Sequence, residues 1–340
     1  VSTRARTSSP ERAAQLTDTR RMTYLHRRQL LGLFGKTSLL AFAPLPLLAA
    51  AQNQKTNLGR LVIIGGAEDR KQDRIILRKF LELSGGPNAK IRVITAASGV
   101  PDVVWASYQA VFQDLGALNC ELVPMLTRDD ASKPDVVSLL AEADGIFITG
   151  GDQNRLMQCL WESPAAQAMH RAFHLNGCCI AGTSAGAAVM SRHMLAEGAP
   201  TPSPQKDVVI TDIGMSFLPN AIVDQHFSQR HRLSRLLSAL AQRPDLLGVG
   251  IDEDTALVIE PNQSIEVVGR GAVTLVDPRR MHSNFDSAED GDQLEMLGLQ
   301  LHLLPANSRY VLPANPKTRK PPVPFWDALG VLAKTGAMRG

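Results

Sequence analysis

The chain has 340 residues, of which 44% are hydrophobic and 20% charged, so it has the composition of a globular protein and the length of one large or two small domains. Residues 1–51 contain eight Lys or Arg against two Asp or Glu, a net charge of +6, which leaves −3 on the rest of a chain whose formal net charge is +3. A mildly acidic body gives no reason to expect a nucleic-acid-binding protein.

Residues 1–51 resemble an export signal. The twin arginine Arg27-Arg28 is followed by the apolar run 39–48 and by three alanines at 49–51, which is the order of regions in a twin-arginine (Tat) signal peptide. The apolar run is about half as long as a bilayer requires and contains two prolines, so we expect no membrane anchor after cleavage. The Tat translocase is therefore the expected partner during export, and the mature protein is expected to be periplasmic or extracellular.

Beyond residue 60, apolar runs of strand length alternate with segments whose apolar residues recur at helical spacing. This alternation is typical of a parallel sheet that helices cover on both faces. We predict strands at 61–64, 91–94, 121–124, 145–149 and 177–181, and helices at 69–83, 103–115, 136–141, 154–159 and 165–174. Because ligands bind at the carboxyl ends of strands in such sheets, the residues that follow each strand are the candidate site.

The second half of the chain is less regular. A Pro-rich connection at 197–207 predicts a flexible flap. We predict further strands at 221–223, 248–251 and 256–259, a helix at 229–242, and a hairpin of 265–268 with 272–276 at the sheet edge. These elements predict one domain, 58–312, followed by a loosely attached Pro- and Lys-rich tail at 313–340.

Four cysteines lie at positions 120, 159, 178 and 179. The adjacent pair falls in a predicted buried strand, where neighbouring residues cannot readily form a disulfide with each other. We therefore predict free buried thiols, and no Cys/His spacing in the chain resembles a zinc site.

The stretch GTSAGA at 182–187 connects the predicted strand 177–181 to a helix that starts near Ala187. A serine at a tight strand-to-helix turn is a candidate nucleophile, and the glycines allow a strained backbone and the close approach of a substrate. The same sequence also suits an ordinary connection in which Thr183 or Ser184 caps the helix. The choice between the two depends on whether the rest of the chain supplies Ser184 with a base.

Acyl transfer by a serine requires a base, an acid that orients the base, and donors for the oxyanion. His226 directly follows a predicted strand. His170 and His174 fall in the predicted helix before the GTSAGA turn, and His193 falls late in the helix after that turn. His226 is therefore the candidate base, with a structural histidine as the alternative. The acid is Asp224, Asp252, Glu253 or Asp254, and the backbone N–H groups of Gly150 or Gly151 and of Ala185 are the candidate oxyanion donors.

Four blocks of the sequence resemble the signature blocks of the cyanophycinase family of serine peptidases, which also contains the aspartyl dipeptidases. The blocks are GGDQ at 150–153, GTSAGA at 182–187, DQHFSQR at 224–230 and GIDEDTAL at 250–257, in the family's order. The resemblance covers residues 65–276. It implies the triad Ser184, His226 and Glu253, a flavodoxin-like, glutamine-amidotransferase-like three-layer α/β fold, often as a homodimer, and no metal or cofactor.

The resemblance also implies a substrate, cyanophycin, which is a polyaspartate backbone with arginine on each side-chain carboxyl, and hydrolysis to β-aspartyl-arginine dipeptides. It places six residues in the substrate groove: Gln153, Asp224, Gln225, Arg230, Arg232 and Arg235. Guanidinium groups suit the free α-carboxylates of the polymer and Asp224 suits an amine or guanidinium, although the arginines also suit a solvated helix face. Two other functions stay open: an aspartyl dipeptidase acting on short peptides, and a non-catalytic binding protein on the same fold.

Overall fold

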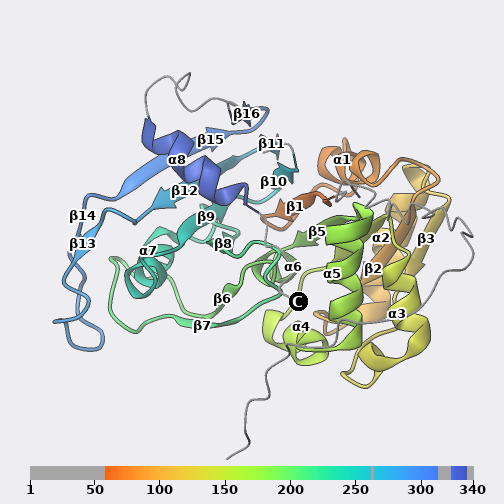
Figure 1. The fold of residues 1–340 in the computed structure, drawn as a ribbon, viewed down its shortest axis with the longest axis horizontal. Coiled ribbons are helices and arrows are strands. Elements are labelled where there is room, and N and C mark those ends of the chain that lie inside the picture. Colours follow the sequence, from red (N-terminus) through yellow and green to blue (C-terminus); the bar gives the residue numbers. More distant parts are fainter. Residues whose placement is uncertain (1–57, 262–263, 313–322, 335–340) are drawn as a thin grey trace, which may run out of the picture. The chain divides into compact units, whose positions relative to one another are not determined.

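The computed structural model describes residues 58–261, 264–312 and 323–334, and Figure 1 shows their elements. The predicted export signal at 1–51 lies outside these residues. All the elements below belong to one unit, Gln52–Gly340.

The larger of two main sheets has eight strands. In spatial order they are β16 (Arg309–Val311), β11 (Ser264–Gly269), β10 (Thr255–Glu260), β1 (Leu61–Ile64), β5 (Cys179–Thr183), β4 (Gly145–Ile148), β2 (Lys90–Ile94) and β3 (Asn119–Leu122). The five strands from β1 to β3 are parallel, and β10, β11 and β16 extend the sheet in antiparallel fashion. Every residue of β1, β4 and β5 is buried, as expected where both faces of a parallel sheet are covered.

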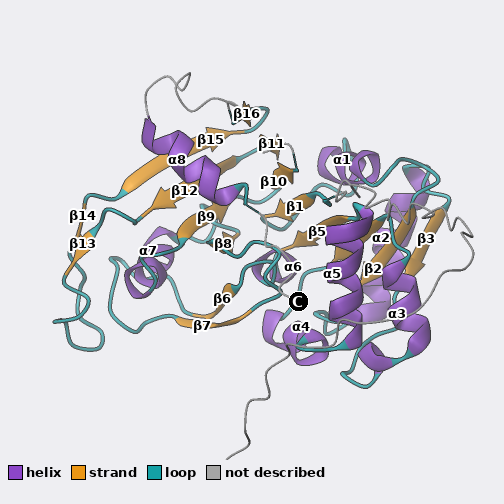
Figure 2. Cartoon of the chain, in the orientation of Figure 1, coloured by secondary structure: helices purple, strands orange, loops and turns teal. Residues whose placement is uncertain are grey.

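Helices cover both faces of this sheet, as Figure 2 shows. Alternate residues of β1 enter different cores: Val62 and Ile64 pack with one group of helices, and Leu61 and Ile63 with the other. The first group is α1 (Ile75–Leu83) and α2 (Pro101–Asp114), and the second includes α3 (Pro134–Ala141), α4 (Gln153–Leu160), α5 (Pro164–Asn176) and the four-residue α6 (Ala185–Ala188), with a short 3-10 turn at Asp130–Ser132. The predicted three-layer α/β fold with a mostly parallel sheet is confirmed.

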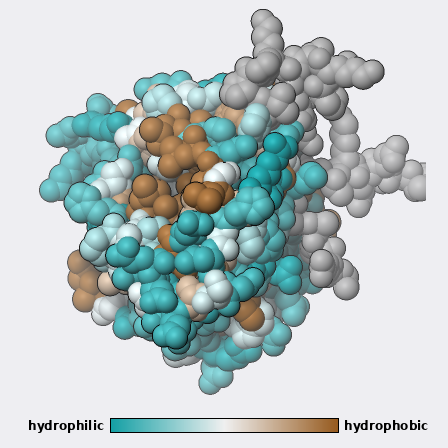
Figure 3. Space-filling view, turned by 90° about the vertical axis from the view of Figure 1, so that its left-hand side faces the viewer, coloured by the Kyte–Doolittle hydropathy of each residue, from teal (hydrophilic) through white to brown (hydrophobic). Residues whose placement is uncertain are grey.

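A second sheet of four strands forms from the chain after α6. Its order is β15 (Gln300–Pro305), β12 (Ala272–Asp277), β9 (Leu247–Ile251) and β8 (Ala221–Gln225), and α7 (Leu233–Gln242) packs on it. Gly248 allows this contact, because a Cβ there would lie 2.7 Å from a methyl carbon of Leu240. Leu301 and Leu303 of the edge strand β15 are exposed. Figure 3 views the molecule from the left-hand side of Figure 1, where hydrophobic groups lie among hydrophilic ones on the surface.

The predicted hairpin of 265–268 with 272–276 is wrong. The first segment, β11, pairs with β10 and β16 in the larger sheet, and the second, β12, pairs with β9 and β15 in the smaller one. The chain changes sheets at Gly269, which has φ +116° and a Cα so close to the Asp254 carbonyl that a Cβ would lie 2.1 Å from the oxygen. A side chain is therefore excluded where the two sheets meet.

The remaining pairs of strands are short. They are β6 (His193–Glu197) with β7 (Ile210–Ile213), and β13 (His282–Ser283) with β14 (Met296–Leu297). His193 therefore lies in a strand and not in a helix, because α6 ends after one turn. The predicted flap connects β6 to β7, and hydrogen bonds fasten it at Gln205, whose N–H donates to Ser238 Oγ at 2.9 Å, and at Lys206, whose N–H donates to the Asp292 carbonyl at 2.9 Å.

The prediction of a loosely attached tail is wrong for residues 323–334. Helix α8 (Val323–Leu332) buries Phe325, Ala328, Leu329 and Leu332 in the main core. The centroid of the Phe325 ring lies 5.0 Å from that of Tyr310 in β16. The Pro- and Lys-rich composition of 313–322 concealed the apolar helix that follows it.

Two predicted helices start later than expected. Helix α1 starts at Ile75 and not at 69, because the Asp69 carboxylate accepts the N–H groups of Lys71, Gln72 and Arg74 and holds the chain in a turn. Helix α7 starts at Leu233 and not at 229, and residues 227–231 form turns.

Candidate active site

Ser184 occupies the turn between β5 and α6 with φ 54° and ψ −112°, an uncommon conformation for a residue other than glycine. The tight turn needs the flanking glycines, since a Cβ on Gly182 would lie 2.2 Å from the carbonyl oxygen of Gly186. Within the described residues Ser184 makes no side-chain capping hydrogen bond to the helix. Its hydroxyl is directed to a histidine instead.

Three side chains form a continuous hydrogen-bonded line. Ser184 Oγ lies 2.9 Å from His226 Nε2, and His226 Nδ1 lies 2.6 Å from Glu253 Oε1. The backbone N–H of Glu253 donates to Gln229 Oε1 at 3.0 Å, which holds the turn that carries the carboxylate. A hydroxyl, an imidazole and an orienting carboxylate in this order have the geometry of nucleophilic catalysis.

The other three candidate acids have different partners. Asp252 accepts the N–H of Ser228 at 3.1 Å and that of Ala272 at 3.0 Å. Asp254 accepts the N–H of Asp69 at 2.8 Å, and Asp224 is paired with arginines. The geometry therefore distinguishes four acids that spacing alone left equivalent, and Glu253 is the one in contact with His226.

Burial and charge act on His226 in opposite directions. The residue is 8% exposed, and burial lowers the pKa of the imidazole below its ordinary value, an effect that the hydrogen bond and charge of Glu253 oppose. The positive charge of Arg230 lowers the pKa further. The imidazole is therefore neutral near pH 7 and able to accept a proton.

The end of β1 and the loop after it hold the three segments that carry the triad side chains. Three successive carbonyl groups accept one backbone N–H from the turn after β5, one from His226 and one from the turn that carries Glu253. The pairs are Ser184 with Ile64 at 3.1 Å, His226 with Gly65 at 2.7 Å, and Asp254 with Gly66 at 2.9 Å. Sequence reasoning missed this role, for which the only local signal is a pair of glycines after the first strand.

Gly150 and Ala185, the predicted oxyanion donors, both lie beside the nucleophile. A Cβ on Gly150 would lie 3.2 Å from Ser184 Cβ and 3.7 Å from its Oγ, so the backbone of this residue passes close to the hydroxyl. Ala185 is the first residue of α6, where a backbone N–H has no partner within the helix. The backbones of both predicted donors therefore lie beside Ser184.

Four of the predicted groove residues contact one another. Asp224, whose side chain is fully buried, accepts Nε of Arg235 at 3.0 Å on one oxygen and Nη2 of Arg235 on the other. Arg232 Nη1 donates to the side-chain oxygen of Gln225 at 2.6 Å and to its carbonyl at 2.7 Å, and burial lowers the pKa of Arg232 to about 10. The guanidinium partners of Asp224 are therefore arginines of the same chain.

The other two predicted groove residues differ in exposure. Arg230 is exposed, and it follows His226 closely enough for its N–H to donate to the His226 carbonyl. Gln153, the first residue of α4, donates to the carbonyl of Ala196 at 2.7 Å. Arg235, from the buried set, donates to the carbonyl of Gly198 at 2.8 Å, so Gln153 holds the end of β6 and Arg235 holds the start of the connection to β7.

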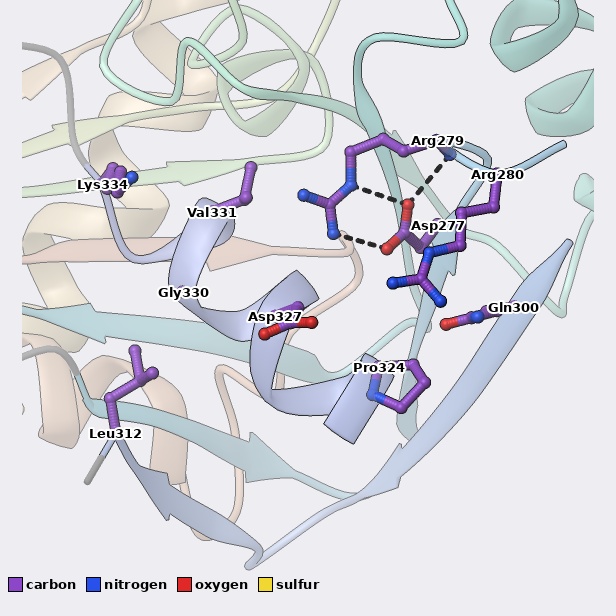
Figure 4. A pocket seen from close by; sticks show the side chains of 10 residues that line it. All are labelled: Asp277, Arg279, Arg280, Gln300, Leu312, Pro324, Asp327, Gly330, Val331 and Lys334. Atoms are coloured by element: carbon purple, nitrogen blue, oxygen red, sulfur yellow. Dashed lines mark hydrogen bonds and ion pairs between the residues drawn. The ribbon is translucent and has the colours of Figure 1, made fainter. Parts of the chain in front are cut away.

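Two cavities lie away from the triad. One of about 510 Å³ is shown in Figure 4, where Arg279 forms a bidentate pair with Asp277 beside α8, and a second of about 550 Å³ is lined by Trp161 and His170. Neither is lined by a triad residue.

Metal ligands, membrane-spanning helices and cysteine thiols were each sought among the described residues. In the part of the chain that the structure describes, no group of three His, Cys, Asp or Glu side chains is placed to hold a metal, and no helix is long and apolar enough to cross a membrane. All four cysteines fall within this part and are free, and burial raises the pKa of Cys120 and of Cys179 to about 12. These thiols are poor nucleophiles, since the thiolate is the reactive form.

Comparison with known proteins identifies the family. The model of peptidase family S51 matches residues 61–267. The chain is 38% identical over 262 residues to the cyanophycinase of Geminocystis herdmanii (strain PCC 6308), and the aligned region covers 77% of this chain and 95% of that protein. It is 37% identical over 268 residues to the cyanophycinase of Thermosynechococcus vestitus (strain NIES-2133 / IAM M-273 / BP-1), and the aligned region covers 78% of this chain and 83% of that protein.

A crystal structure of a peptidase from an acI-B1 Actinobacterium has the same fold, with a TM-score of 0.57, 24% identity, and coverage of 75% of this chain and 97% of that one. The family match extends from β1 into β11 and includes Ser184, His226 and Glu253. On this match the chain belongs to peptidase family S51 and is a serine-type peptidase.

Proposed function

We propose that the protein hydrolyses cyanophycin to β-aspartyl-arginine dipeptides through an acyl-enzyme on Ser184. The observation that carries the proposal is the line of contacts from Ser184 Oγ to His226 at 2.9 Å and on to Glu253 at 2.6 Å. It occurs in a chain that is 38% identical to a protein named cyanophycinase. The chemistry and the substrate class are thus supported by independent observations.

In the proposed first step, His226 Nε2 accepts the proton of Ser184 Oγ while Oγ bonds to the scissile carbonyl carbon. The carbonyl electron pair moves to oxygen, where the N–H groups of Gly150 and Ala185 stabilise the negative charge. Loss of one such donor typically reduces kcat by about 10²- to 10³-fold. The protonated imidazole is stabilised by Glu253, which also fixes the orientation of the ring.

The tetrahedral intermediate then collapses, and the carbon–nitrogen bond breaks. The leaving amine takes the proton from His226, and the acyl group remains on Ser184. Water enters, gives a proton to His226 and bonds to the acyl carbon. The bond from that carbon to Ser184 Oγ then breaks, His226 returns the proton to Oγ, and the carboxylic acid product leaves and gives its own proton to the solvent. The two halves use the same base and the same oxyanion donors.

For the substrate we propose that Arg230 contacts a carboxylate of the polymer directly. It is exposed, its N–H donates to the His226 carbonyl, and its positive charge lowers the pKa of His226, which together support a place for its guanidinium near the reacting centre. A guanidinium binds a carboxylate with two parallel hydrogen bonds. The buried set of Asp224, Gln225, Arg232 and Arg235 shapes the groove wall. Gln153 and Arg235 also hold the end of β6 and the start of its connection to β7.

The test compares the polymer with short substrates. Purified protein is incubated with cyanophycin and, separately, with Asp-containing dipeptides, and products are identified by mass spectrometry. We expect release of β-aspartyl-arginine from the polymer. Rapid cleavage of the short peptides with the polymer untouched would instead favour an aspartyl dipeptidase, and failure to react with a fluorophosphonate would favour a non-catalytic binding protein.

We also propose export by the twin-arginine route, which the order of basic, apolar and small residues in 1–51 supports. Replacing Arg27 and Arg28 together by Lys should leave the protein in the cytoplasm, as judged by fractionation. Mature double variant found outside the cytoplasm at the wild-type level would contradict this route. The homodimer implied by the family resemblance predicts twice the mass of one chain in sedimentation analysis.

A further inference from the structure

Glu68 lies in the loop after β1, next to the glycines that hold the triad. Its side chain is buried, with the residue 5% exposed. One carboxylate oxygen accepts the hydroxyl of Thr183, and the other accepts the phenol of Tyr108. The guanidinium of Arg70 lies 5.2 Å from the centroid of the Tyr108 ring. A carboxylate is costly to bury, so its retention at this position needs a reason.

Thr183 is the last residue of β5 and is covalently joined to Ser184. Ser184 has a positive φ of 54°, a conformation that persists only where the surroundings hold it. The turn at Ser184 is held through its backbone, because the Ser184 N–H donates to the carbonyl of Ile64 at the end of β1. The Thr183 hydroxyl supplies a second attachment, through its side chain, to Glu68 in the loop that follows β1.

Tyr108 completes the support. It extends from α2, where it packs with Phe112 and Phe147 in the core, so it fixes the second oxygen of the carboxylate to a rigid element. Burial, followed by the charge of Glu68, raises the pKa of Tyr108 well above its ordinary value. The phenol therefore remains a donor throughout the range in which the enzyme is expected to work.

We propose that Glu68 is a positioning residue for the nucleophile, which it holds through the hydroxyl of Thr183. The proposal rests on the proposed role of Ser184. Glu68 contacts neither Ser184 nor His226 through its carboxylate, so it acts on the direction of Oγ and not on the proton transfer itself. A misplaced nucleophile slows the chemical step and leaves the groove, and hence substrate binding, intact.

The test uses Glu68→Ala, Glu68→Gln and the pair Thr183→Val and Thr183→Ser. We expect Glu68→Ala and Thr183→Val each to reduce kcat by about 100-fold with KM within about twofold of wild type. Glu68→Gln keeps one oxygen acceptor, so its kcat should fall by about 10-fold. Thr183→Ser keeps the hydroxyl, so its kcat should stay within about threefold of wild type. The double variant Glu68→Ala/Thr183→Val should be no slower than either single variant, because both remove one interaction.

A second readout is independent of substrate. The rate at which a fluorophosphonate labels Ser184 should fall in Glu68→Ala by the same factor as kcat. Ser163→Ala is the control for stability. It removes the buried cap of α5, in which Ser163 Oγ accepts the Ala166 N–H at 3.1 Å, and it leaves the contacts of Glu68 with Thr183 and Tyr108 in place. It should lower the unfolding temperature and leave kcat and the labelling rate unchanged.

Wild-type kcat and labelling rate in folded Glu68→Ala and Thr183→Val would overturn the proposal, as would losses that match those of Ser163→Ala at equal loss of stability. If Glu68→Ala does not fold, the difference between Thr183→Val and Thr183→Ser decides. Activity that survives in Ser184→Ala would refute the proposed mechanism. An inactive Ser184→Ala beside a fully active Glu68→Ala would refute the positioning role alone.

Discussion

The imidazole of His226 packs directly against the backbone of Gly66. A Cβ on Gly66 would lie 2.3 Å from the ring carbon Cε1 and 2.5 Å from Nε2, and the glycine has φ +99°. The position of the proposed base is therefore set by a residue 160 positions earlier in the chain, which no spacing rule relates to it.

Gly66→Ala should displace the imidazole from Ser184 and reduce kcat by about 100-fold or more. Gly116→Ala is a matched control, because Gly116 has φ +87° and open space around its Cα. Both variants incur backbone strain, so both should be less stable, by about 1 kcal/mol for the control. Steady-state kinetics at a temperature where both are folded separates the effects, and equal kcat values would contradict the account.

The acid limb of the activity profile should depend on Arg230. The proposed base acts as a neutral imidazole, so kcat/KM should fall as pH drops through the pKa of His226, which burial and the charge of Arg230 hold below the ordinary value of 6.5. Arg230→Gln removes the positive charge, and the pKa and the acid limb should move to higher pH. Glu253→Gln removes a partner that raises the pKa, so its acid limb should move to lower pH. Limbs that coincide with the wild-type limb would contradict this assignment.

Loss of Arg235 should lower stability, whereas loss of Arg230 should weaken substrate binding. Arg235→Ala leaves the fully buried Asp224 without its bidentate partner, which should cost about 3–5 kcal/mol of unfolding free energy. Arg230→Ala, on the exposed turn, should leave the denaturation midpoint unchanged and raise KM for the polymer. Urea denaturation and steady-state kinetics on both variants test this division. The reverse pattern would place Arg235 in direct contact with substrate.

His174 should make the fold sensitive to acid. Burial, and then the charge of His170, lowers its pKa from 6.5 to about 4. The unfolded chain therefore binds more protons than the folded one between these values, so stability is fully present above pH 6.5 and is lost as pH falls toward 4. His174→Phe should lose less stability than wild type between pH 6.5 and pH 4.5, measured by urea denaturation. An equal loss in both proteins would contradict the role of this histidine.

Much of the candidate site follows from local sequence. Ser184 and His226 each stand after an apolar run that forms a buried strand, and parallel strands bring such positions to one edge of the sheet. The choice of Glu253 over its neighbours Asp252 and Asp254 depends on the direction of each side chain in a tight turn. Spacing does not encode that direction, and only the resemblance to a family selected Glu253.

Other features depend on contacts between distant parts of the chain. Strands β11 and β12 are adjacent in sequence and read as a hairpin, yet their partners lie in different sheets, which only long-range pairing decides. Glu68 carries no local signal, because its partners Thr183 and Tyr108 come from β5 and α2. Helix α8 was missed because the Pro- and Lys-rich segment before it dominated the composition of the tail.

The most direct test of the central claim is the release of β-aspartyl-arginine from cyanophycin by wild type and by Ser184→Ala at equal concentration. Wild type should release the dipeptide, and the variant, which loses the nucleophile but keeps its fold, should release it at least about 10⁴-fold more slowly. Equal rates of dipeptide release by the two proteins would contradict the role of Ser184 as nucleophile.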